Sequence, residues 1–286
     1  YFLIGDLNFT CGVDMTDFGI LADQWLMSGC TSPDNCGQAD IDRNGVVEFE
    51  DVVQLAEQWL QLENILPPLP PLPSPMVWWA MDETEGIVVS DCNGVHHGQV
   101  INSTGDIWAA GHSGNALKLD GVDDYVDIAG YTGITGTTSR TCSAWIKADS
   151  TGVEQVIMSW GSEADGQRWI LRLQATGQLA VDIQNGYIYV YDTDSMADGQ
   201  WHHVAAVLVD DGSPSLEEIK LYVDGFSQVV KYNTFRLIVN TSAGQNVQLG
   251  AVCTDLVRTK FFEGLLDDVR IYNVPLTALQ VYQLAG

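Results

Sequence analysis

A proline-rich segment divides this chain of 286 residues and limits what its two sides can share. The segment reads ILPPLPPLPSPM from Ile65 to Met76 and holds six prolines. Proline fixes the backbone φ angle and lacks an N–H donor, so the run favours extended polyproline and excludes a helix or a central strand. At about 3.1 Å per residue, the proline-rich part spans roughly 28 Å. We therefore predict a domain at 1–64, a stiff linker at 65–76 and a domain at 77–286. The PxxP spacing also matches ligands of signalling domains, but a spacer is the favoured interpretation.

The first domain contains one unit twice. The segment DLNFTCGVDMTDFGILADQWL, from Asp6, aligns without a gap with DIDRNGVVEFEDVVQLAEQWL, from Asp40. Each copy begins with polar residues at alternate positions and ends with apolar residues at helical spacing. Each copy therefore predicts a polar loop that leads into a helix.

The polar positions have the spacing of a calcium-binding loop. Such a loop supplies oxygens from positions 1, 3, 5, 7, 9 and 12, with glycine at the sixth position for the sharp turn. The second copy has Gly45 sixth, and its expected ligands are Asp40, Asp42, Asn44, the carbonyl of Val46, Glu48 and Asp51. The first copy has Cys11 sixth, and its expected ligands are Asp6, Asn8, Thr10, the carbonyl of Gly12, Asp14 and Asp17. We expect two calcium ions, and we expect a chelator to unfold residues 1–62.

The two units resemble a known module. Too few residues precede each loop to form an entering helix, and each following helix ends in LA(D/E)QWL. With the loop spacing and the duplication, these features make the segment from about Gly5 to Gln61 resemble a bacterial type I dockerin. The resemblance implies two structural calcium ions and docking to a cohesin-like module in an extracellular assembly.

Three expectations concern contacts within and around this module. Dockerins often carry Ser-Thr at loop positions ten and eleven, where this chain has Met15-Thr16 and Phe49-Glu50, so the partner's identity stays open. Val13 and Val47 share position eight, where paired loops usually make a short strand-like contact. For Trp25 and Trp59 a shared helix core is the favoured interpretation, and a docking surface is the alternative.

Composition favours an extracellular protein that attracts cations. Twelve basic residues against 38 acidic ones give a formal charge of −26, which disfavours nucleic acid and anionic lipid as partners. No run approaches the roughly 20 apolar residues of a membrane span, and the chain begins at Tyr1 without a signal-like segment, as expected of a mature secreted or cell-surface protein. The six cysteines lack zinc-site spacing and predict disulfides, whose pairing stays open, although Cys30 and Cys36 could close a short loop.

The second domain predicts strands with almost no helix. Short alternating runs separated by Gly, Asn and Asp indicate an antiparallel two-sheet sandwich. The runs are ALKLDG, DYVDI, RTCSAWIKA, EQVIMSW, RWILRLQ, LAVDIQ, YIYVY, WHHVAAVLV, EIKLYVDG, NVQLGA and GLLDDVRIY. Only the tail, PLTALQVYQLAG, has a helical pattern. The fold class expected for the chain is thus mainly β, an antiparallel jelly-roll sandwich with a small all-α duplicated calcium-loop domain in front.

Several segments of the second domain resemble a laminin G-like, concanavalin A-like jelly roll over residues 77–286. They are MDETEG, DCNGVHHGQV, ALKLDGVDDYVDI, WHHVAAV, LYVDG and GLLDDVRIYNVPLT. Many proteins of this kind hold one structural calcium near the chain ends. The resemblance implies such a site at Asp91, Asn93, Asp267 and Asp268, with ordinary turn and strand-edge chemistry as the alternative.

Other polar and aromatic residues of this domain are candidates for a functional role. Glucanases of the same broad fold carry an ExDxxE strand, which is absent from the sequence, so no catalytic residue is expected. His202 and His203 point to opposite faces of a strand, which favours a packing role. Tyr187, Tyr189 and Tyr191 alternate with aliphatic residues, so their rings are expected on one face about 6.8 Å apart, twice the strand rise. They form a candidate glycan platform, with strand propensity as the alternative.

These features favour a secreted, non-catalytic, calcium-binding adaptor or adhesion protein. Its front module docks to a cohesin-like or self protein partner, its linker sets the distance, and its sandwich binds glycan or protein. The alternative is a structural subunit that assembles into an extracellular filament or surface layer, for which the apolar YFLI start is a candidate edge strand. Light scattering with and without calcium separates the two.

Overall fold

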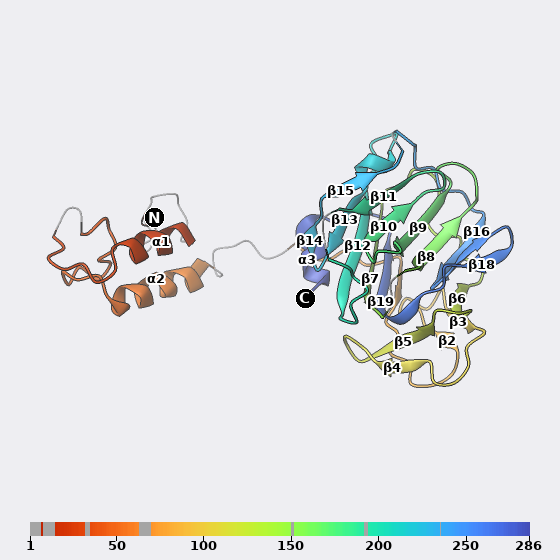
Figure 1. Cartoon of the computed structure of the whole chain (residues 1–286), viewed down its shortest axis with the longest axis horizontal. Helices are drawn as coiled ribbons and strands as arrows, with labels where there is room; N and C mark the ends of the chain where they lie inside the picture. Colours follow the sequence, from red (N-terminus) through yellow and green to blue (C-terminus); the bar gives the residue numbers. More distant parts are fainter. Residues whose placement is uncertain are drawn as a thin grey trace. The chain divides into compact units, whose positions relative to one another are not determined.

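The computed structural model describes residue 7 and residues 15–31, 35–62, 70–149, 152–191, 194–234 and 236–286, with only the backbone at 15 and 57–62. The chain forms two compact units, Tyr1–Leu69 and Pro70–Gly286, coloured along the sequence in Figure 1. The division between the units falls within the proline-rich segment. None of the described helices combines the length and the apolar character that a membrane span requires.

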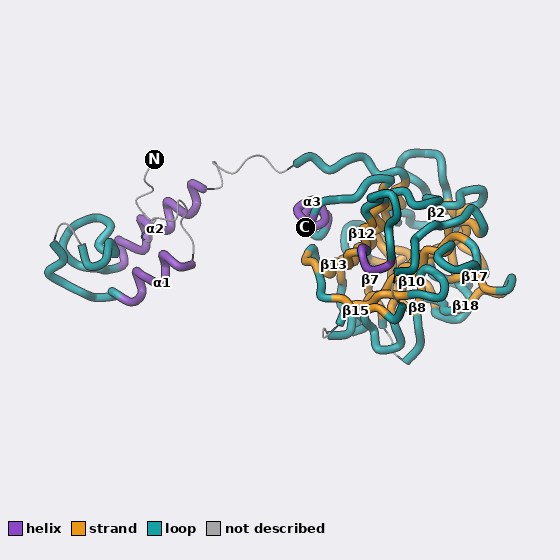
Figure 2. The backbone as a smooth tube through the Cα atoms, turned by 90° about the horizontal axis from the view of Figure 1, so that it is seen from above, coloured by secondary structure: helices purple, strands orange, loops and turns teal. Residues whose placement is uncertain are grey.

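The first unit contains two helices, α1 at Met15–Asp23 and α2 at Phe49–Leu62 (Figure 2). Both helices begin at loop position ten of their copy. Each has its position-twelve aspartate in the first turn, where a carboxylate interacts favourably with the helix dipole. The repeat therefore produces two equivalent helix starts.

Equivalent residues of the two copies form the core of this unit. The buried cluster consists of Leu7, Leu21, Cys30, Ala39, Ile41, Val47 and Leu55. Leu7 and Ile41 share loop position two, and Leu21 and Leu55 share a helix position. The predicted core role of Trp25 is wrong, because its side chain is 42% exposed and the leucines one turn earlier fill the space between the helices. The side chain of Trp59 lies outside the described residues.

The segment after α1 crosses the second loop and is closed by a disulfide. Leu26 donates its N–H to Val47 O at 2.9 Å, and Val47 donates its own to Met27 O at 2.9 Å. Val13, the partner expected for Val47 at position eight, lies outside the described residues. Cys30 and Cys36 form the predicted disulfide, with their Cα atoms 5.1 Å apart.

The second unit is an antiparallel sandwich of two sheets, as predicted (Figures 1 and 2). The eight-stranded sheet has the order β14-β13-β12-β7-β19-β5-β4, and β1 pairs with β19. Its strands are β1 Val77–Trp79, β4 Trp108–Ala110, β5 Asn115–Asp120, β7 Arg140–Ala148, β12 His202–Leu208, β13 Lys220–Val223, β14 Phe226–Ser227 and β19 Glu263–Tyr272.

The nine-stranded sheet has the order β15-β11-β10-β9-β8-β16-β6-β3-β2. Its strands are β2 Val88–Val89, β3 Gly98–Ile101, β6 Tyr125–Ile128, β8 Gln155–Gly161, β9 Arg168–Leu173, β10 Leu179–Asp182, β11 Tyr187–Val190, β15 Val230–Tyr232 and β16 Gln245–Leu249. A separate hairpin consists of β17 Val252–Thr254 and β18 Val257–Thr259. The strands β5 and β6 are consecutive in the chain but belong to different sheets.

The core lies between the two sheets and follows the two-residue period of the strands. Trp169, Leu171 and Leu173 of β9 point inward, and Ile188 and Val190 of β11 do the same. Trp160 and Trp169 stack with ring centroids 6.0 Å apart. The outward side chains are Arg168, Ile170 and Arg172 in β9 and tyrosines in β11.

The predicted tail helix is present as α3, Ala278–Leu284. Thr277 caps it by accepting the N–H of Gln280, whose side chain accepts the N–H of Thr277 in return. Val281 and Leu284 pack against the outer face of the eight-stranded sheet, in a buried cluster with Ala205, Val207, Tyr222, Tyr272 and Leu276. One 3-10 turn, Leu216–Glu218, precedes β13.

Candidate functional site

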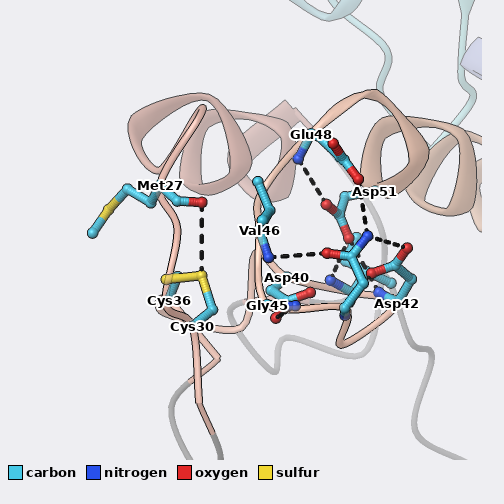
Figure 3. The surroundings of a disulfide bond; sticks show 11 residues. Met27, Cys30, Cys36, Asp40, Asp42, Gly45, Val46, Glu48 and Asp51 are labelled. Atoms are coloured by element: carbon cyan, nitrogen blue, oxygen red, sulfur yellow. Dashed lines mark hydrogen bonds between the residues drawn. A yellow bond between two sulfur atoms is a disulfide. The ribbon is translucent and has the colours of Figure 1, made fainter.

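Three carboxylates meet in the second loop of the front unit (Figure 3). Asp40, Asp42 and Asp51 each bring one carboxylate oxygen within 4.8 Å of the other two. Asp51 is fully buried, and Asp40 is 2% exposed. Gathering negative charge in a buried place is unfavourable without a counter-charge, so the loop has the electrostatics of a cation site.

Backbone N–H groups hold two of these carboxylates in place. Asp51 Oδ1 accepts from Ile41 N at 2.6 Å and from Asp42 N at 3.1 Å, and its Oδ2 accepts from Glu48 N at 2.9 Å. Asp40 Oδ2 accepts from Gly45 N at 3.1 Å, and Gly45 has a φ angle of 99°, as expected for the sixth position. Asp40 Oδ1 is buried and has no hydrogen-bond donor within the described chain.

An amide group bridges the remaining predicted ligands. Asn44 Nδ2 donates to Asp42 Oδ2 and to Glu48 Oε1, each at 2.9 Å, and Asn44 Oδ1 accepts from Val46 N at 2.9 Å. A cation between these carboxylates would take the place of the amide N–H groups. The donor set is entirely oxygen, which suits a hard divalent cation such as calcium.

The first loop repeats one contact of the second. Asp17 Oδ1 accepts the N–H of Leu7 at 2.7 Å, as Asp51 Oδ1 accepts that of Ile41. Both contacts join loop position twelve to position two. The other predicted ligands of the first copy, Asp6, Asn8, Thr10, Gly12 and Asp14, lie outside the described residues.

An apolar groove lies between α1 and α2. It is lined by Phe18, Leu21, Ala22, Trp25, Phe49 and Val52. Trp25 is 42% exposed and Phe49 is 66% exposed. Large apolar side chains gathered at a surface are typical of an interaction site. Phe49 occupies loop position ten of the second copy, one of the two positions considered for partner contact.

In the sandwich, Asp91 and Asn93 are used in backbone hydrogen bonds. The two oxygens of Asp91 accept N–H groups at 3.0 to 3.2 Å from Trp78, Asn93, Val95 and His96. Burial favours a higher pKa for this carboxyl, but the four hydrogen bonds outweigh it and lower the pKa. Asn93 Nδ2 donates to the carbonyls of Pro75 and Met76. Both side chains therefore stabilise the backbone at the start of β1.

Asp267 and Asp268 of β19 turn to different neighbours. Asp267 Oδ2 accepts from His112 N at 2.8 Å and Ser113 N at 3.0 Å, and burial raises the pKa of this carboxyl to about 6. Asp268 Oδ1 accepts from Trp78 Nε1 at 2.6 Å and Arg270 Nη2 at 2.9 Å. Asp267 Oδ1 is buried and has no hydrogen-bond donor in the described chain. Among the described residues, Asp91, Asp267 and Asp268 do not form a group of three close carboxylates, and calcium binding by these residues stays a prediction.

The tyrosines of β11 lie on the outer face of the nine-stranded sheet. Tyr187 and Tyr189 have ring centroids 6.0 Å apart and an interplanar angle of 42°, close to the expected spacing. Tyr191 follows the strand, and Lys231 Nζ lies 3.2 Å from the centroid of its ring. Tyr187 and Tyr189 thus form a close ring pair, and a lysine covers the third ring.

Charged side chains of β9 and β10 lie beside the ring pair. The guanidinium carbon of Arg172 lies 5.3 Å from the ring centroid of Tyr187. Arg172 forms ion pairs with Glu154 at 2.7 Å and Asp182 at 3.8 Å, and Asp182 is the cross-strand neighbour of Tyr187. Arg172 is only 2% exposed, so the charged groups open to solvent beside the rings are the partly exposed carboxylates of Asp182 and Glu154.

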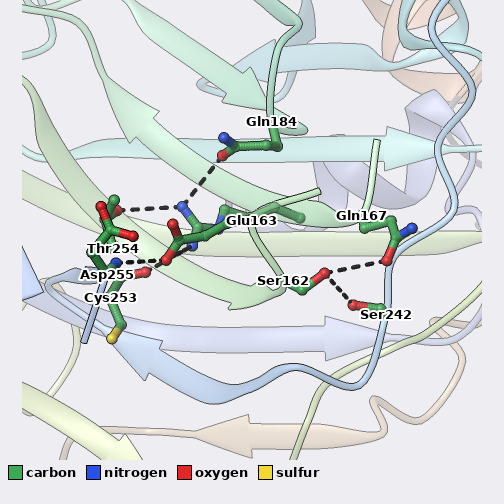
Figure 4. Close-up of polar contacts among 9 residues, drawn as sticks. Ser162, Glu163, Gln167, Gln184, Ser242, Cys253, Thr254 and Asp255 are labelled. Atoms are coloured by element: carbon green, nitrogen blue, oxygen red, sulfur yellow. Dashed lines mark hydrogen bonds and ion pairs between the residues drawn. The ribbon is translucent and has the colours of Figure 1, made fainter. Parts of the chain in front are cut away.

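A second arginine of β9, Arg168, contacts the β17–β18 hairpin. Arg168 donates to Cys253 O at 2.7 Å and pairs with Glu163 at 3.2 Å, and Glu163 accepts the N–H of Asp255 at 2.7 Å. Figure 4 shows Glu163, Cys253 and Asp255 together with Gln184 and Thr254. Both arginines belong to the run RWILRL, which the sequence predicted only as a strand, and their partners come from other segments.

A further acidic group escaped the sequence prediction. Asp120, Asp123 and Asp124 lie in the turn between β5 and β6 and bring carboxylate oxygens within 4.8 Å of one another. The sequence signal for this group is three aspartates within five residues, in a segment that resembles a landmark of the fold.

Comparison with known proteins agrees with the architecture of the second unit. The sequence profile described as the "Concanavalin A-like lectin/glucanases superfamily", of laminin G type, matches residues 120–282. Among curated proteins, no sequence gives a significant match.

Two solved structures illustrate the similarity of fold. Domain 4 of a GH43 extracellular arabinanase from Geobacillus stearothermophilus, solved in complex with arabinotriose, is 23% identical with a TM-score of 0.55, and the match covers 74% of this chain and 98% of that one. The receptor binding domain of botulinum neurotoxin D is 15% identical with a TM-score of 0.50, and the match covers 74% of this chain and 52% of that one. At these identities the likeness concerns the fold.

Proposed function

The chain belongs to the concanavalin A-like lectin/glucanases superfamily, and from this premise we propose that it is an extracellular, non-catalytic protein whose sandwich binds a glycan. Membership of a superfamily does not determine a ligand. The observation that carries the proposal is the ring pair of Tyr187 and Tyr189 on the outer face of β11. Sugars place C–H groups against aromatic faces and hydroxyl groups against polar side chains, and the partly exposed carboxylate of Asp182 lies opposite Tyr187 on the neighbouring strand.

A glycan-binding measurement tests this proposal. Arabinotriose and longer arabino-oligosaccharides are the first probes, because a protein of similar fold is solved with arabinotriose. Calorimetry with a wider glycan panel follows. We expect Tyr187→Ala and Tyr189→Ala each to weaken binding about fivefold or more, since an aromatic contact contributes about 1 kcal/mol. Tyr282→Ala is the matched control, because Tyr282 is exposed on α3 and packs against Phe226.

The contrary outcome is equal binding by the wild type and all three variants, or no binding of any glycan. The non-catalytic part of the proposal rests on the absence of an ExDxxE strand from the sequence. Glycans that bind are expected to be recovered intact after incubation, and release of shorter sugars would contradict that part.

The proposal extends to the front unit, which binds calcium and docks to a partner. Two loops hold calcium, the second through Asp40, Asp42, Asn44, the Val46 carbonyl, Glu48 and Asp51. Bound calcium supplies the positive charge that lets these carboxylates stay close. The groove of Phe18, Trp25 and Phe49 then docks to a cohesin-like module, and residues 65–76 act as the spacer. Support comes from the close carboxylates of the second loop and from the exposure of Trp25 and Phe49.

Docking is tested with immobilised cohesin-like modules in calcium. Phe49→Ser and Trp25→Ser are expected to weaken capture tenfold or more, since exposed aromatic residues dominate interfaces. Phe226→Ser, at a residue exposed on the sandwich, serves as control. The filament alternative predicts large calcium-dependent particles in light scattering. The YFLI segment considered for that alternative lies outside the described residues.

A further inference from the structure

The turn between β5 and β6 gathers negative charge away from the sites discussed so far. Asp120, Asp123 and Asp124 each offer a carboxylate oxygen within 4.8 Å of the other two. Asp120 and Asp123 are exposed, whereas Asp124 is only 4% exposed. Asp120 Oδ1 accepts the N–H groups of Val122, Asp123 and Asp124, which fixes the turn. The group is thus preformed, with one buried member and two members open to solvent.

The buried carboxylate is an independent indication of a ligand. Asp124 Oδ1 is shielded from solvent and has no hydrogen-bond donor in the described chain. A buried carboxylate oxygen without a donor is unfavourable, by several kcal/mol on the order-of-magnitude scale of ion burial when the group is charged.

Within the described chain, no basic side chain forms an ion pair with the carboxylates of this turn. Among the described residues, none of the ion pairs formed by lysine, arginine or histidine involves Asp120, Asp123 or Asp124. The same signature appears in the second loop of the front unit, where three carboxylates lie within 4.8 Å and buried Asp40 Oδ1 has no donor. A cation from solution would compensate the charge of these three carboxylates.

We propose that the β5–β6 turn binds a divalent cation, and that the cation is calcium because every side-chain ligand is a carboxylate oxygen. Asp124 is the inner ligand, Asp120 and Asp123 are the outer ligands, and water completes the coordination on the solvent side. The site differs from Asp91, Asn93, Asp267 and Asp268 and from the loops of the front unit. Since β5 and β6 belong to different sheets, the ion fastens one edge of the sandwich.

The test counts calcium ions bound to the full chain by native mass spectrometry in calcium chloride. We expect Asp123→Asn and Asp124→Asn each to bind one ion fewer than the wild type, with the affinity of that site lowered about tenfold or more, because calcium affinity follows ligand charge. Asp106→Asn is the matched control, since Asp106 is an exposed acid outside both acidic groups and its variant is expected to keep the wild-type count. Calcium is also expected to raise the Tm of the sandwich in the wild type more than in Asp123→Asn.

Asp123 is exposed, so Asp123→Asn should fold even if Asp124→Asn does not. In that case the ion count of Asp123→Asn alone tests calcium binding at the β5–β6 turn. An Asp40→Asn variant separates the two units, because it is expected to lose an ion of the front unit while the β5–β6 site remains filled. Wild-type ion counts and affinities in Asp123→Asn and in folded Asp124→Asn would overturn the proposal. That result would mean that Asp124 has a structural role in the turn and does not bind calcium.

Discussion

Arg140 is fully buried in the sandwich and connects three segments of the chain. Its guanidinium donates to the carbonyls of Ile134, Gly136 and Thr138 and to Thr241 Oγ1. It also lies 5.2 Å from the ring centroid of Trp169. Burial lowers the pKa of Arg140 to about 10, which still leaves the side chain charged at neutral pH. The charge is therefore compensated by carbonyl dipoles and an aromatic face.

Replacing Arg140 is expected to destabilise the sandwich strongly. Arg140→Met keeps most of the volume but leaves three backbone carbonyls and Thr241 without this donor. We expect the free energy of unfolding to fall by about 3 kcal/mol or more. Denaturation in urea followed by tryptophan fluorescence measures the change. Arg236→Met, at an exposed residue, should stay within about 0.5 kcal/mol. Similar midpoints for the two variants would contradict this account of Arg140.

His203 makes stability depend on pH. Burial, and next the charge of Arg270, lowers the pKa of His203 to about 4, against about 6.5 in an unfolded chain. The unfolded state thus binds more protons between these values. The stability contributed by neutral His203 is complete above pH 6.5 and is lost as pH falls to 4, by up to about 3 kcal/mol. His203→Asn should remove this contribution, as measured by the Tm of the sandwich across that range.

Asp267 supplies the control for this pH prediction, because its sign is opposite. Its pKa is raised to about 6, so its contribution is greatest when it is protonated and is lost as pH rises from about 4 to 6. Asp267→Asn should therefore steepen the acid loss that His203 causes. The two pKa assignments would be refuted if stability fell more steeply with acid in His203→Asn, and less steeply in Asp267→Asn, than in the wild type.

Loop spacing was enough to select Asp40 and Asp51, because calcium-loop ligands lie close in sequence. Spacing gives no such guide where partners are remote. The hydrogen-bond donors to Asp267 come from residues about 150 positions away in the sequence. The buried oxygen of Asp124 also depends on tertiary packing, so neither residue could be assigned from sequence.

At the scale of elements, alternation located the long strands, and all eleven predicted runs contain a strand. Among the strands that were not predicted, β2 and β14 have two residues each, too short to show a period, and β3 has four. In the front unit, periodicity identified both helices but not which apolar residue faces inward. Leu21 is buried and Trp25 is exposed, although both belong to the same stripe.

Gly264 in β19 is predicted to be indispensable to the pairing of β19 with β7. Its φ angle is 141°, and an added Cβ would lie 2.1 Å from Lys147 O. Gly264→Ala should therefore cost about 2 kcal/mol or more, because strain in the backbone adds to overpacking. Gly130→Ala is the control, with a φ angle of 79° and open space around the added Cβ. It should cost about 1 kcal/mol by strain alone. Equal urea midpoints for the two variants would show that the contact with Lys147 is harmless.

The Cys30–Cys36 disulfide is predicted to stabilise the front unit and not the sandwich. A closed loop of this length is worth about 2 kcal/mol in the chain-entropy model. The double variant Cys30→Ser/Cys36→Ser should lower the stability of α1 and α2 by that amount, as followed by circular dichroism in calcium. Cys92→Ser removes an exposed free thiol and should have no effect. An unchanged helix signal in the double variant would contradict this role.

For the whole molecule, the two units obtain their stability from different sources. The sandwich has a large continuous core. Among its described residues, the front unit has a buried core of seven, a short disulfide and clustered carboxylates. Small units with little apolar burial usually need a metal or a crosslink to fold. The central claim is therefore that calcium holds the front unit together while the sandwich persists without it.

Hydrogen–deuterium exchange of the full chain, in calcium and in chelator, tests this claim most directly. The account predicts that removal of calcium opens the amides of residues 15–62 by a hundredfold or more. The amides of β7, β12 and β19 should continue to exchange slowly. Equal protection of residues 15–62 in both conditions would contradict it.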